Sequence, residues 1–489
     1  MTSSLMIVGT ASHVGKSIVA TALCRILKQR GIRVAPFKSQ NMALNSYVCR
    51  DGSEIGRAQV VQAEAAGVEP EADMNPILLK PTTDRQMQVV LHGRVHGTMS
   101  ASEYYERKPF FFEECLQSFH RLASKFDVII LEGAGSAVEV NLKERDIVNL
   151  PFAKAVGSAA LLVADIDRGG VFASIAGTFA LLDDDESNRI RGFIINRFRG
   201  DLTLFAGGPE FLERRTGRPC LGVLPYIDSL RIDQEDSVSL EDHRSEAGSF
   251  RVAVIRLPRI SNYTDFNPLE CISGVTVEYV SEPDRTSSPD LVIVPGTKNT
   301  IADLRWLIDR GFKKLLLDTV ERGGWVLGIC GGYQMLGRRI SGPFGAEEGG
   351  TQAGLGFLRV ETELDIDKVT VQSKGRSFVG SIVNGYEIHM GRTAHLESID
   401  PFITKEDGKK DGAVYGRIAG TYFHGLFDNA DFTSKFLTLV AQSRRLAWRP
   451  GSLRISKDDE YNRLAAVARE HLDMGEHLDM ERIYALLKV

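Results

Sequence analysis

Short apolar runs alternate with amphipathic stretches over the first 225 residues. The apolar runs are residues 5–8, 34–37, 128–131, 159–164, 192–195 and 221–224. Continuous apolar strands separated by helical stretches are typical of a parallel sheet that is covered on both faces. The pattern therefore predicts an α/β domain over residues 1–227.

A second series of apolar runs begins after an acidic stretch. Residues 228–250 are poor in apolar side chains and contain seven acidic residues against two basic ones, which predicts a linker. The second series comprises residues 251–255, 291–294, 325–327 and 420–423. It predicts a second α/β domain over residues 251–443, followed by a helical tail over residues 444–489, where the pattern becomes helical and charged.

Composition narrows the class of protein. The chain has 489 residues, 43% of them hydrophobic and 25% charged, and its net charge of −5 lacks the basic excess of a nucleic-acid binder. Six scattered cysteines contain no CxxC pair, so neither a disulfide framework nor a thiolate zinc site is indicated, and we expect a reducing, cytoplasmic setting. We expect no signal peptide and no membrane span. Oligomeric state is not indicated.

A loop typical of nucleotide-binding proteins follows the first apolar run. The sequence GTASHVGKS at residues 9–17 precedes a helical pattern, so its backbone N–H groups and the helix N-terminus are expected to bind phosphate. Lys16 would neutralise the β- and γ-phosphates and Ser17 would ligate Mg²⁺. The first glycine is one position early for the GxxxxGK[ST] form, which resembles the loop of dethiobiotin synthetase-like ATPases. The alternative is a tight turn that binds no nucleotide. The residues expected to bind ATP here are Gly9, Thr10, Gly15, Lys16 and Ser17.

Polar residues follow three further apolar runs, where the carboxyl ends of parallel strands collect ligands. Glu132 is the predicted second Mg²⁺ ligand, and Asn196 is predicted to read the adenine edge of ATP. Asp165 and Asp167 are weaker candidates for binding metal or substrate or for positioning the loop. For each residue alone, a helix cap or turn is an alternative interpretation.

The second domain contains a nucleophile motif. GICGG at residues 328–332 follows an apolar run and precedes a helical pattern, which predicts an elbow with Cys330 as nucleophile. Gly331 and Gly296 are predicted to supply the oxyanion-hole N–H groups. His424, at the end of the run 420–423, is the predicted base, with His389 and His395 as rivals. The alternative for Cys330 is a buried, unreactive thiol.

Ordered motifs along nearly the whole chain resemble those of the cobyric acid synthase family. They are GTASHVGKS at 9–17, FKSQNMALNS at 37–46, MNPILLKP at 74–81, EGAGS at 132–136, ADIDRGGVFAS at 164–174, INRFRGD at 195–201, LPRISN at 257–262, PGTKNT at 295–300, GICGGYQMLG at 328–337 and YFHG at 422–425.

The resemblance implies an N-terminal ATPase domain like dethiobiotin synthetase and a C-terminal class I glutamine amidotransferase domain. It implies amidation of the b, d, e and g carboxylates of a corrinoid, adenosylcobyrinic acid a,c-diamide, to adenosylcobyric acid with L-glutamine, ATP and Mg²⁺. Residues within or near these motifs that become candidates for contact with substrate or phosphate are Lys38, Asn41, Lys80 and Asp146.

The chain departs from the class I glutaminase pattern at one position, and two alternative functions remain open. Ordinary class I glutaminases carry a glutamate two residues after the catalytic histidine, where this chain has Leu426, so we expect a Cys–His dyad whose orienting residue is open. A cobyrinic acid a,c-diamide synthase resembles the chain in both domains, but the segment at residues 38–41 favours cobyric acid synthase. A non-catalytic nucleotide-switch ATPase would leave the Cys330 elbow unexplained.

Overall fold

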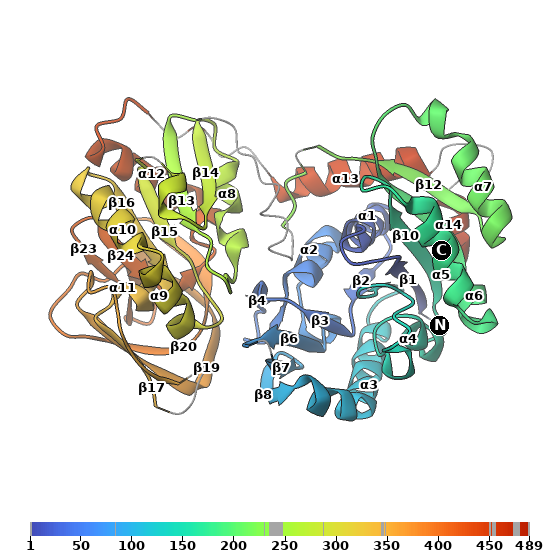
Figure 1. Cartoon of the computed structure of the whole chain (residues 1–489), viewed down its shortest axis with the longest axis horizontal. Coiled ribbons are helices and arrows are strands. Elements are labelled where there is room, and N and C mark those ends of the chain that lie inside the picture. Colours follow the sequence, from blue (N-terminus) through green and yellow to red (C-terminus); the bar gives the residue numbers. More distant parts are fainter. Residues whose placement is uncertain are drawn as a thin grey trace.

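A computed structural model of the chain has two α/β lobes side by side (Figure 1). It describes residues 2–83, 85–228, 230–233, 248–286, 288–343, 347, 349–448, 451, 456–472 and 480–487. Each lobe is built on a mainly parallel sheet, which confirms the predicted fold class. Most of the linker predicted over residues 228–250 lies outside the described residues.

The N-terminal lobe contains a six-stranded parallel sheet. Alternate residues of its strands enter two cores: Leu5 and Ile7 of the first strand pack with the first helix, whereas Met6 and Val8 pack on the opposite face. Burial on both faces explains why these strands are continuously apolar. In sheet order, the strands are β12 (Cys220–Pro225), β11 (Ile190–Phe198), β10 (Ala159–Asp165), β1 (Ser3–Gly9), β9 (Val128–Glu132) and β2 (Val34–Phe37).

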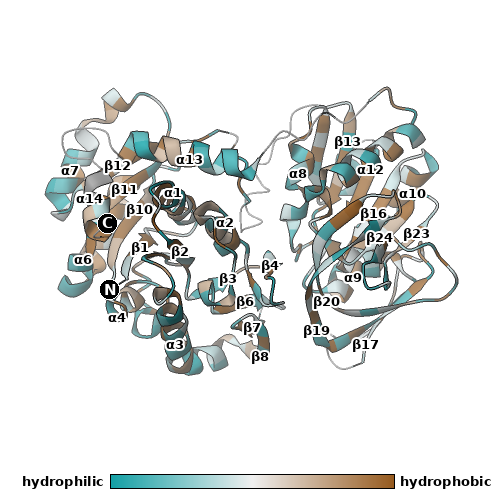
Figure 2. Cartoon of the chain, turned by 180° about the vertical axis from the view of Figure 1, so that it is seen from behind, coloured by the Kyte–Doolittle hydropathy of each residue, from teal (hydrophilic) through white to brown (hydrophobic). Residues whose placement is uncertain are grey.

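Helices cover this sheet, and many of their outward-facing residues are polar (Figure 2). They are α1 (Lys16–Gln29), α2 (Arg57–Ala66), α3 (Ala101–Ala123), α4 (Leu150–Ala155), α5 (Val171–Leu181), α6 (Asp184–Arg189) and α7 (Gly207–Thr216), with short 3-10 turns η1 (Ala72–Met74), η2 (Lys143–Arg145) and η3 (Leu202–Phe205).

Two small sheets, which the apolar runs did not predict, lie on the side of this lobe that faces the other lobe (Figure 1). One has the order β3-β6-β7-β8 and the other pairs β4 with β5. Their strands are β3 (Gln40–Met42), β4 (Ser46–Val48), β5 (Glu54–Gly56), β6 (Ile77–Pro81), β7 (Gln86–Leu91) and β8 (Arg94–Ser100).

The C-terminal lobe has a six-stranded sheet in the order β14-β13-β15-β16-β24-β23, in which all neighbours but β23 and β24 run parallel. The strands are β13 (Phe250–Ile255), β14 (Val275–Val280), β15 (Leu291–Val294), β16 (Trp325–Ile329), β23 (Ala413–Tyr415) and β24 (Ile418–Thr421). The helices are α8 (Asn267–Glu270), α9 (Thr300–Asp309), α10 (Phe312–Glu321), α11 (Gly331–Leu336) and α12 (Ala430–Ser443), with turns η5 (Tyr263–Phe266), η6 (Pro283–Arg285) and η7 (Leu426–Asp428).

A second sheet of this lobe corrects one prediction. The apolar run 420–423 forms two strands, because β24 ends at Thr421 and β25 (Phe423–His424) pairs antiparallel with β20 in a different sheet. His424 therefore does not lie at the end of a parallel strand. The other strands of this sheet are β17 (Arg339–Gly342), β18 (Gly350–Ala353), β19 (Val360–Ser377), β20 (Ile382–His395), β21 (Ile403–Lys405) and β22 (Lys410–Asp411).

The tail returns to the N-terminal lobe. Its helices α13 (Lys457–Leu472) and α14 (Met480–Leu487), red in Figure 1, lie on that lobe. Tyr461, Leu464 and Leu472 of α13 join the core that contains α1 and β12. Arg30, directly after α1, lies over the Tyr484 ring of α14, with its guanidinium carbon 3.7 Å from the ring centroid. None of the helices in the described ranges is long and apolar enough to cross a membrane.

Candidate active sites

The P-loop holds the ammonium group of Lys16 against backbone carbonyl groups. Lys16 Nζ donates to the carbonyl oxygens of Ala11, at 2.9 Å, and Gly135, at 2.8 Å. Gly15 precedes α1 with a φ of 100°, a conformation that residues with side chains rarely adopt. The loop thus places one lysine and a helix N-terminus together, an arrangement that binds phosphate.

Glu132, at the end of β9, is the centre of a buried polar cluster. Its Oε1 accepts hydrogen bonds from Ser17 Oγ and Lys38 Nζ, each at 2.9 Å, and its Oε2 accepts one from Gln62 Nε2 at 2.5 Å. Burial by itself would raise the pKa of the Glu132 carboxyl, but the Lys38 ammonium and these hydrogen bonds hold that pKa below its usual value. The carboxylate is therefore charged at neutral pH.

Ser17 and Glu132, the predicted Mg²⁺ ligands, lie within hydrogen-bond distance of each other. Mg²⁺ commonly takes one or two protein oxygens and completes its shell with phosphate and water oxygens. Among the residues that the structure describes, no group of three or more His, Cys, Asp or Glu side chains is arranged to hold a metal. This donor set fits a nucleotide-bound Mg²⁺ better than a metal held by protein side chains alone.

The other predicted strand-end residues have protein partners. Asn196 Nδ2 donates to the carbonyl oxygen of Val14 at 2.9 Å, so the Asn196 side chain supports the P-loop from β11. Asp165 and Asp167 accept hydrogen bonds, at 2.8 and 2.7 Å, from two arginines at or after the end of β11. Asp165 pairs in register with Asn196, so these groups share one sheet edge and position its loops.

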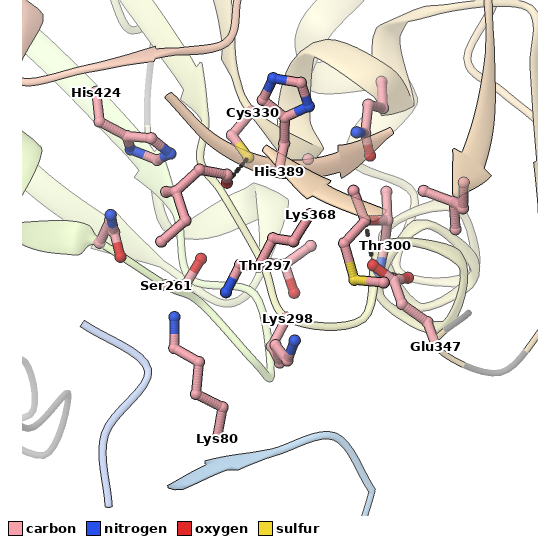
Figure 3. Close-up of a pocket in the computed structure, with 16 residues that line it drawn as sticks. Lys80, Ser261, Thr297, Lys298, Thr300, Cys330, Glu347, Lys368, His389 and His424 are labelled. Carbon is pink, nitrogen blue, oxygen red and sulfur yellow. Dashed lines mark hydrogen bonds between the residues drawn. The ribbon is translucent and has the colours of Figure 1, made fainter. Parts of the chain in front are cut away.

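The substrate candidates lie in different places. Lys38 belongs to the Glu132 cluster, and Asn41 Nδ2 donates to the buried Gln59 Oε1 at 3.1 Å. Asp146 accepts backbone N–H groups of Val148 and Asn149, at 2.7 and 3.1 Å, and so shapes the turn before α4. Lys80, from β6 of the N-terminal lobe, lines the pocket that also contains Cys330 (Figure 3), and its contact with substrate or phosphate stays a prediction.

Cys330 occupies the sharp turn between β16 and α11. Its φ of 52° and ψ of −110° are strained values for a residue with a side chain, as expected at a nucleophile elbow. Gly332 is required here, because a Cβ atom at this position would lie 1.8 Å from the carbonyl oxygen of Val294. The Cys330 side chain lines the pocket, and its Sγ lies 3.4 Å from the carbonyl oxygen of Ile388.

His424 also lines this pocket, and its ring is turned toward the cavity beside Cys330 (Figure 3). His424 Nδ1 lies 2.6 Å from Oδ2 of Asp265 in η5, and Asp265 Oδ1 accepts the backbone N–H of Gly425 at 3.1 Å. Burial by itself would lower the pKa of His424, but the Asp265 carboxylate and the Cys330 sulfur raise it to about 10. His424 thus lies beside Cys330 with one ring nitrogen held by Asp265, an arrangement suited to proton transfer with the thiol.

The rival histidines are placed differently. His389 lines the pocket, but its ring stacks on Tyr422 at 3.7 Å and its Nδ1 pairs with the carbonyl oxygen of Gly391 at 2.9 Å. Burial lowers the pKa of His389. His395 ends β20 and is absent from the described pocket lining.

The two predicted oxyanion glycines lie close to these groups. Gly331 lines the pocket directly after Cys330. A Cβ atom at Gly296 would lie 3.5 Å from Cε1 of His424, so the Gly296 backbone runs beside the base. Their role as oxyanion-hole donors stays a prediction.

Lysines from both lobes enter the Cys330 pocket. Lys80 comes from β6 of the N-terminal lobe, and Lys298 and Lys368 come from the C-terminal lobe (Figure 3). Burial, with Lys368 and Lys80 nearby, lowers the pKa of Lys298 to about 7. The Lys298 ammonium donates to Gln88 Oε1 of the other lobe at 3.0 Å. The pocket is therefore closed by both lobes.

Among the residues of this site that sequence reasoning missed are Gln334 and Asp265. Gln334, four residues after Cys330, lines the pocket, and its buried Oε1 has no hydrogen-bond partner among the described residues. That oxygen is an acceptor for a ligand. Asp265 lies 159 positions before His424 in the chain. No spacing in the sequence identifies Asp265. Gln334 could have been recognised, because it lies one helix turn after the elbow.

Comparison with known protein families matches each lobe to a known type of domain. The profile of the CobQ/CobB/MinD/ParA nucleotide binding domain matches residues 5–239, and that of the CobB/CobQ-like glutamine amidotransferase domain matches residues 251–432. The cobyric acid synthase of Caldanaerobacter subterraneus subsp. tengcongensis is 48% identical, and the alignment covers 100% of this chain and 99% of that protein. The cobyric acid synthase of Dehalococcoides mccartyi is 46% identical, and the alignment covers 100% of this chain and 99% of that protein. The cobyric acid synthase of Photorhabdus laumondii is 47% identical, and the alignment covers 99% of this chain and 98% of that protein. At this identity over the full length of both sequences, the chain belongs to the cobyric acid synthase family.

Proposed function

We propose that this chain converts the b, d, e and g side-chain carboxylates of adenosylcobyrinic acid a,c-diamide into carboxamides, giving adenosylcobyric acid. Glutamine supplies the nitrogen and ATP supplies the energy. The observation that carries the proposal is that a P-loop site and a Cys330 pocket occur in one chain, with the pocket lined by both lobes. Family membership supports the corrinoid as substrate, because the full-length relatives are named cobyric acid synthase.

The N-terminal lobe would activate the carboxylate. A carboxylate is a poor acyl donor because it is anionic and resonance-stabilised, so one of its oxygens attacks the γ-phosphorus of ATP and ADP leaves. Lys16 would offset phosphate charge during this transfer. Ser17 and Glu132 would hold Mg²⁺, which supplies further positive charge at the phosphates. Ammonia then attacks the acyl carbon, and inorganic phosphate leaves.

The C-terminal lobe would supply the ammonia. The Cys330 thiolate attacks the side-chain amide carbon of glutamine while His424, having taken the thiol proton, returns a proton to the departing ammonia. Water then cleaves the Cys330 thioester and releases glutamate. Free ammonia at neutral pH is mostly ammonium, so release next to the other lobe supplies the neutral nucleophile. The described cysteines are all free thiols, which suits the cytoplasm as the place of this reaction.

The test separates the two halves with paired variants. Cys330→Ala should reduce glutamine-dependent amidation by about 1000-fold or more, because no thioester forms, and should keep ammonia-dependent amidation near the parent rate. Lys16→Ala should abolish amidation with both nitrogen sources. Products are resolved by mass for each corrinoid acceptor, which also distinguishes a cobyrinic acid a,c-diamide synthase by the acceptor it uses. Equal loss of both rates in folded Cys330→Ala protein would contradict the proposal.

A further inference from the structure

We infer that Asp265 is the positioning residue of the glutaminase, so that Cys330, His424 and Asp265 act as a triad. The inference rests on the proposed function and adds a residue from a different part of the chain. The position that carries glutamate in ordinary class I glutaminases is Leu426, whose apolar side chain is buried and cannot accept a hydrogen bond.

A catalytic histidine needs an acceptor at one ring nitrogen so that the other presents its lone pair to the thiol. Asp265 Oδ2 meets this need at His424 Nδ1, at 2.6 Å. His424 Nε2 is buried and has no hydrogen-bond partner within bonding geometry in the described part of the chain, and the ring lies beside Cys330. The aspartate therefore occupies Nδ1, so that Nε2 is the nitrogen that exchanges the proton with the thiol, and its charge stabilises the imidazolium formed when that proton moves to Nε2.

The Asp265 carboxylate is fixed from both sides. Its second oxygen accepts the Gly425 N–H at 3.1 Å, directly after the histidine that it orients. Tyr386 of β20 stacks on the His424 ring with centroids 5.3 Å apart and planes 17° apart. Two contacts from the aspartate and one stacked ring thus restrict the imidazole to a single orientation.

The segment that carries Asp265 is also held by the other lobe. Asn262 Nδ2 donates to the carbonyl oxygen of Ser46 at 3.2 Å, and Tyr263 N donates to Asn45 Oδ1 at 3.1 Å. These contacts join η5 to the loop before β4. The titratable groups that face His424 are Cys330, Asp265 and Tyr386, and Asp428 and Arg57 lie beyond them.

The test uses the full chain with Asp265→Asn and Asp265→Glu. Asp265→Asn keeps the shape but removes the charge that favours the imidazolium, so kcat with glutamine should fall by about 100-fold or more while KM for glutamine stays within about threefold. Ammonia-dependent amidation should be unchanged. Asp265→Glu should recover part of the lost kcat.

A second readout separates positioning from a structural role. The pH at which iodoacetamide alkylates Cys330, followed on the Cys330 peptide by mass spectrometry, should move upward in Asp265→Asn, because the thiolate loses its imidazolium partner. Asp290→Asn is the control: this buried aspartate of the same lobe accepts the backbone N–H of Arg251 and the guanidinium of Arg444 and makes no contact with His424, so its loss should not move that pH. An unchanged alkylation profile, or equal loss with both nitrogen sources, overturns the role of Asp265. Full glutamine-dependent activity in Cys330→Ala would instead overturn the proposed function.

Discussion

Glu132 keeps its charge inside the N-terminal lobe because Lys38 lies against it. Both side chains are almost fully buried, and their closest atoms are 2.9 Å apart. An uncompensated buried charge is strongly unfavourable. Because Lys38 supplies the counter-charge, the Glu132 carboxylate stays ionised next to Ser17 without water to solvate it. The same cation that stabilises Glu132 also adds positive charge beside the phosphate loop.

We predict that Lys38→Met lowers the free energy of unfolding by about 3–5 kcal/mol at pH 8, because it leaves Glu132 buried without a counter-charge. In the parent protein the pKa of Glu132 lies below its unfolded value, so the pair contributes stability above about pH 4.3 and loses it as pH falls further. In the variant, burial raises that pKa, and the deficit should shrink at pH 5.

Chemical denaturation at pH 8 and pH 5 measures this difference. Lys125→Met is the matched control, because Lys125 pairs with Glu71 at the surface, with side-chain exposures of 48% and 33%. Its effect should stay below about 1 kcal/mol at both pH values. A pH-independent deficit in Lys38→Met would show that lost packing, not charge, dominates.

At the scale of elements, α13 is a distant part of the sequence that completes the first core. Leu464 is buried against α1 and β12 although it follows the whole C-terminal lobe. We predict that Leu464→Ala lowers the free energy of unfolding by about 2–5 kcal/mol, because it leaves a cavity under α13.

The loss should appear in the N-terminal lobe. Hydrogen exchange of α1 and β12 amides should accelerate, while the amides of β13 and β15 keep their protection. Glu470→Ala, at an exposed position of the same helix, is the control. Equal acceleration in both lobes would contradict the assignment of α13 to the first core.

The elements that sequence predicted best are those with one dominant signal. The parallel strands could be predicted because burial on both faces restricts them to apolar residues. The loop before α1 could be predicted because a phosphate loop requires glycines at fixed positions. The long antiparallel pair β19 and β20 interleaves many polar residues with apolar ones, and the strands β3–β8 are short or mixed, so they gave no clear apolar run. The run at 420–423 misled, since apolarity does not show that Tyr422 lies between strands of two sheets.

The same reasoning separates the site residues. Lys16 and Cys330 could be predicted as site residues because each lies in a local sequence motif. Asp265 could not, because its role depends on tertiary contact with His424 and with the opposite lobe.

At the scale of the whole molecule, one buried carboxylate joins the two lobes. Glu54 of β5 accepts hydrogen bonds from Lys80 of its own lobe and from Lys368 of β19, the latter at 2.5 Å. Burial by itself would raise the pKa of Glu54, but Lys368 and Lys80 hold it well below its usual value. This ion cluster lies at the Cys330 pocket, so the contact that joins the lobes also closes the pocket.

We predict that Glu54→Gln weakens this docking by about 2–5 kcal/mol, because Lys80 and Lys368 would then face each other without a counter-charge. The ratio of glutamine-dependent to ammonia-dependent amidation should fall, and X-ray scattering should report a larger radius of gyration. Glu71→Gln, in the surface pair with Lys125, should change neither quantity. Normal compactness with a normal ratio in Glu54→Gln would remove the cluster from the docking interface.

The return of α13 and α14 to the N-terminal lobe has a consequence for how the chain is made. Strand β1 and helix α1 leave the ribosome early, but the apolar side chains that cover them, Tyr461 and Leu464 among them, emerge only after the whole C-terminal lobe has been synthesised. During synthesis the N-terminal domain usually folds first. Here its folding is delayed, because the first sheet stays partly uncovered while the second lobe can already fold. Translation that stalls before α13 would leave this apolar face exposed to chaperones and to aggregation.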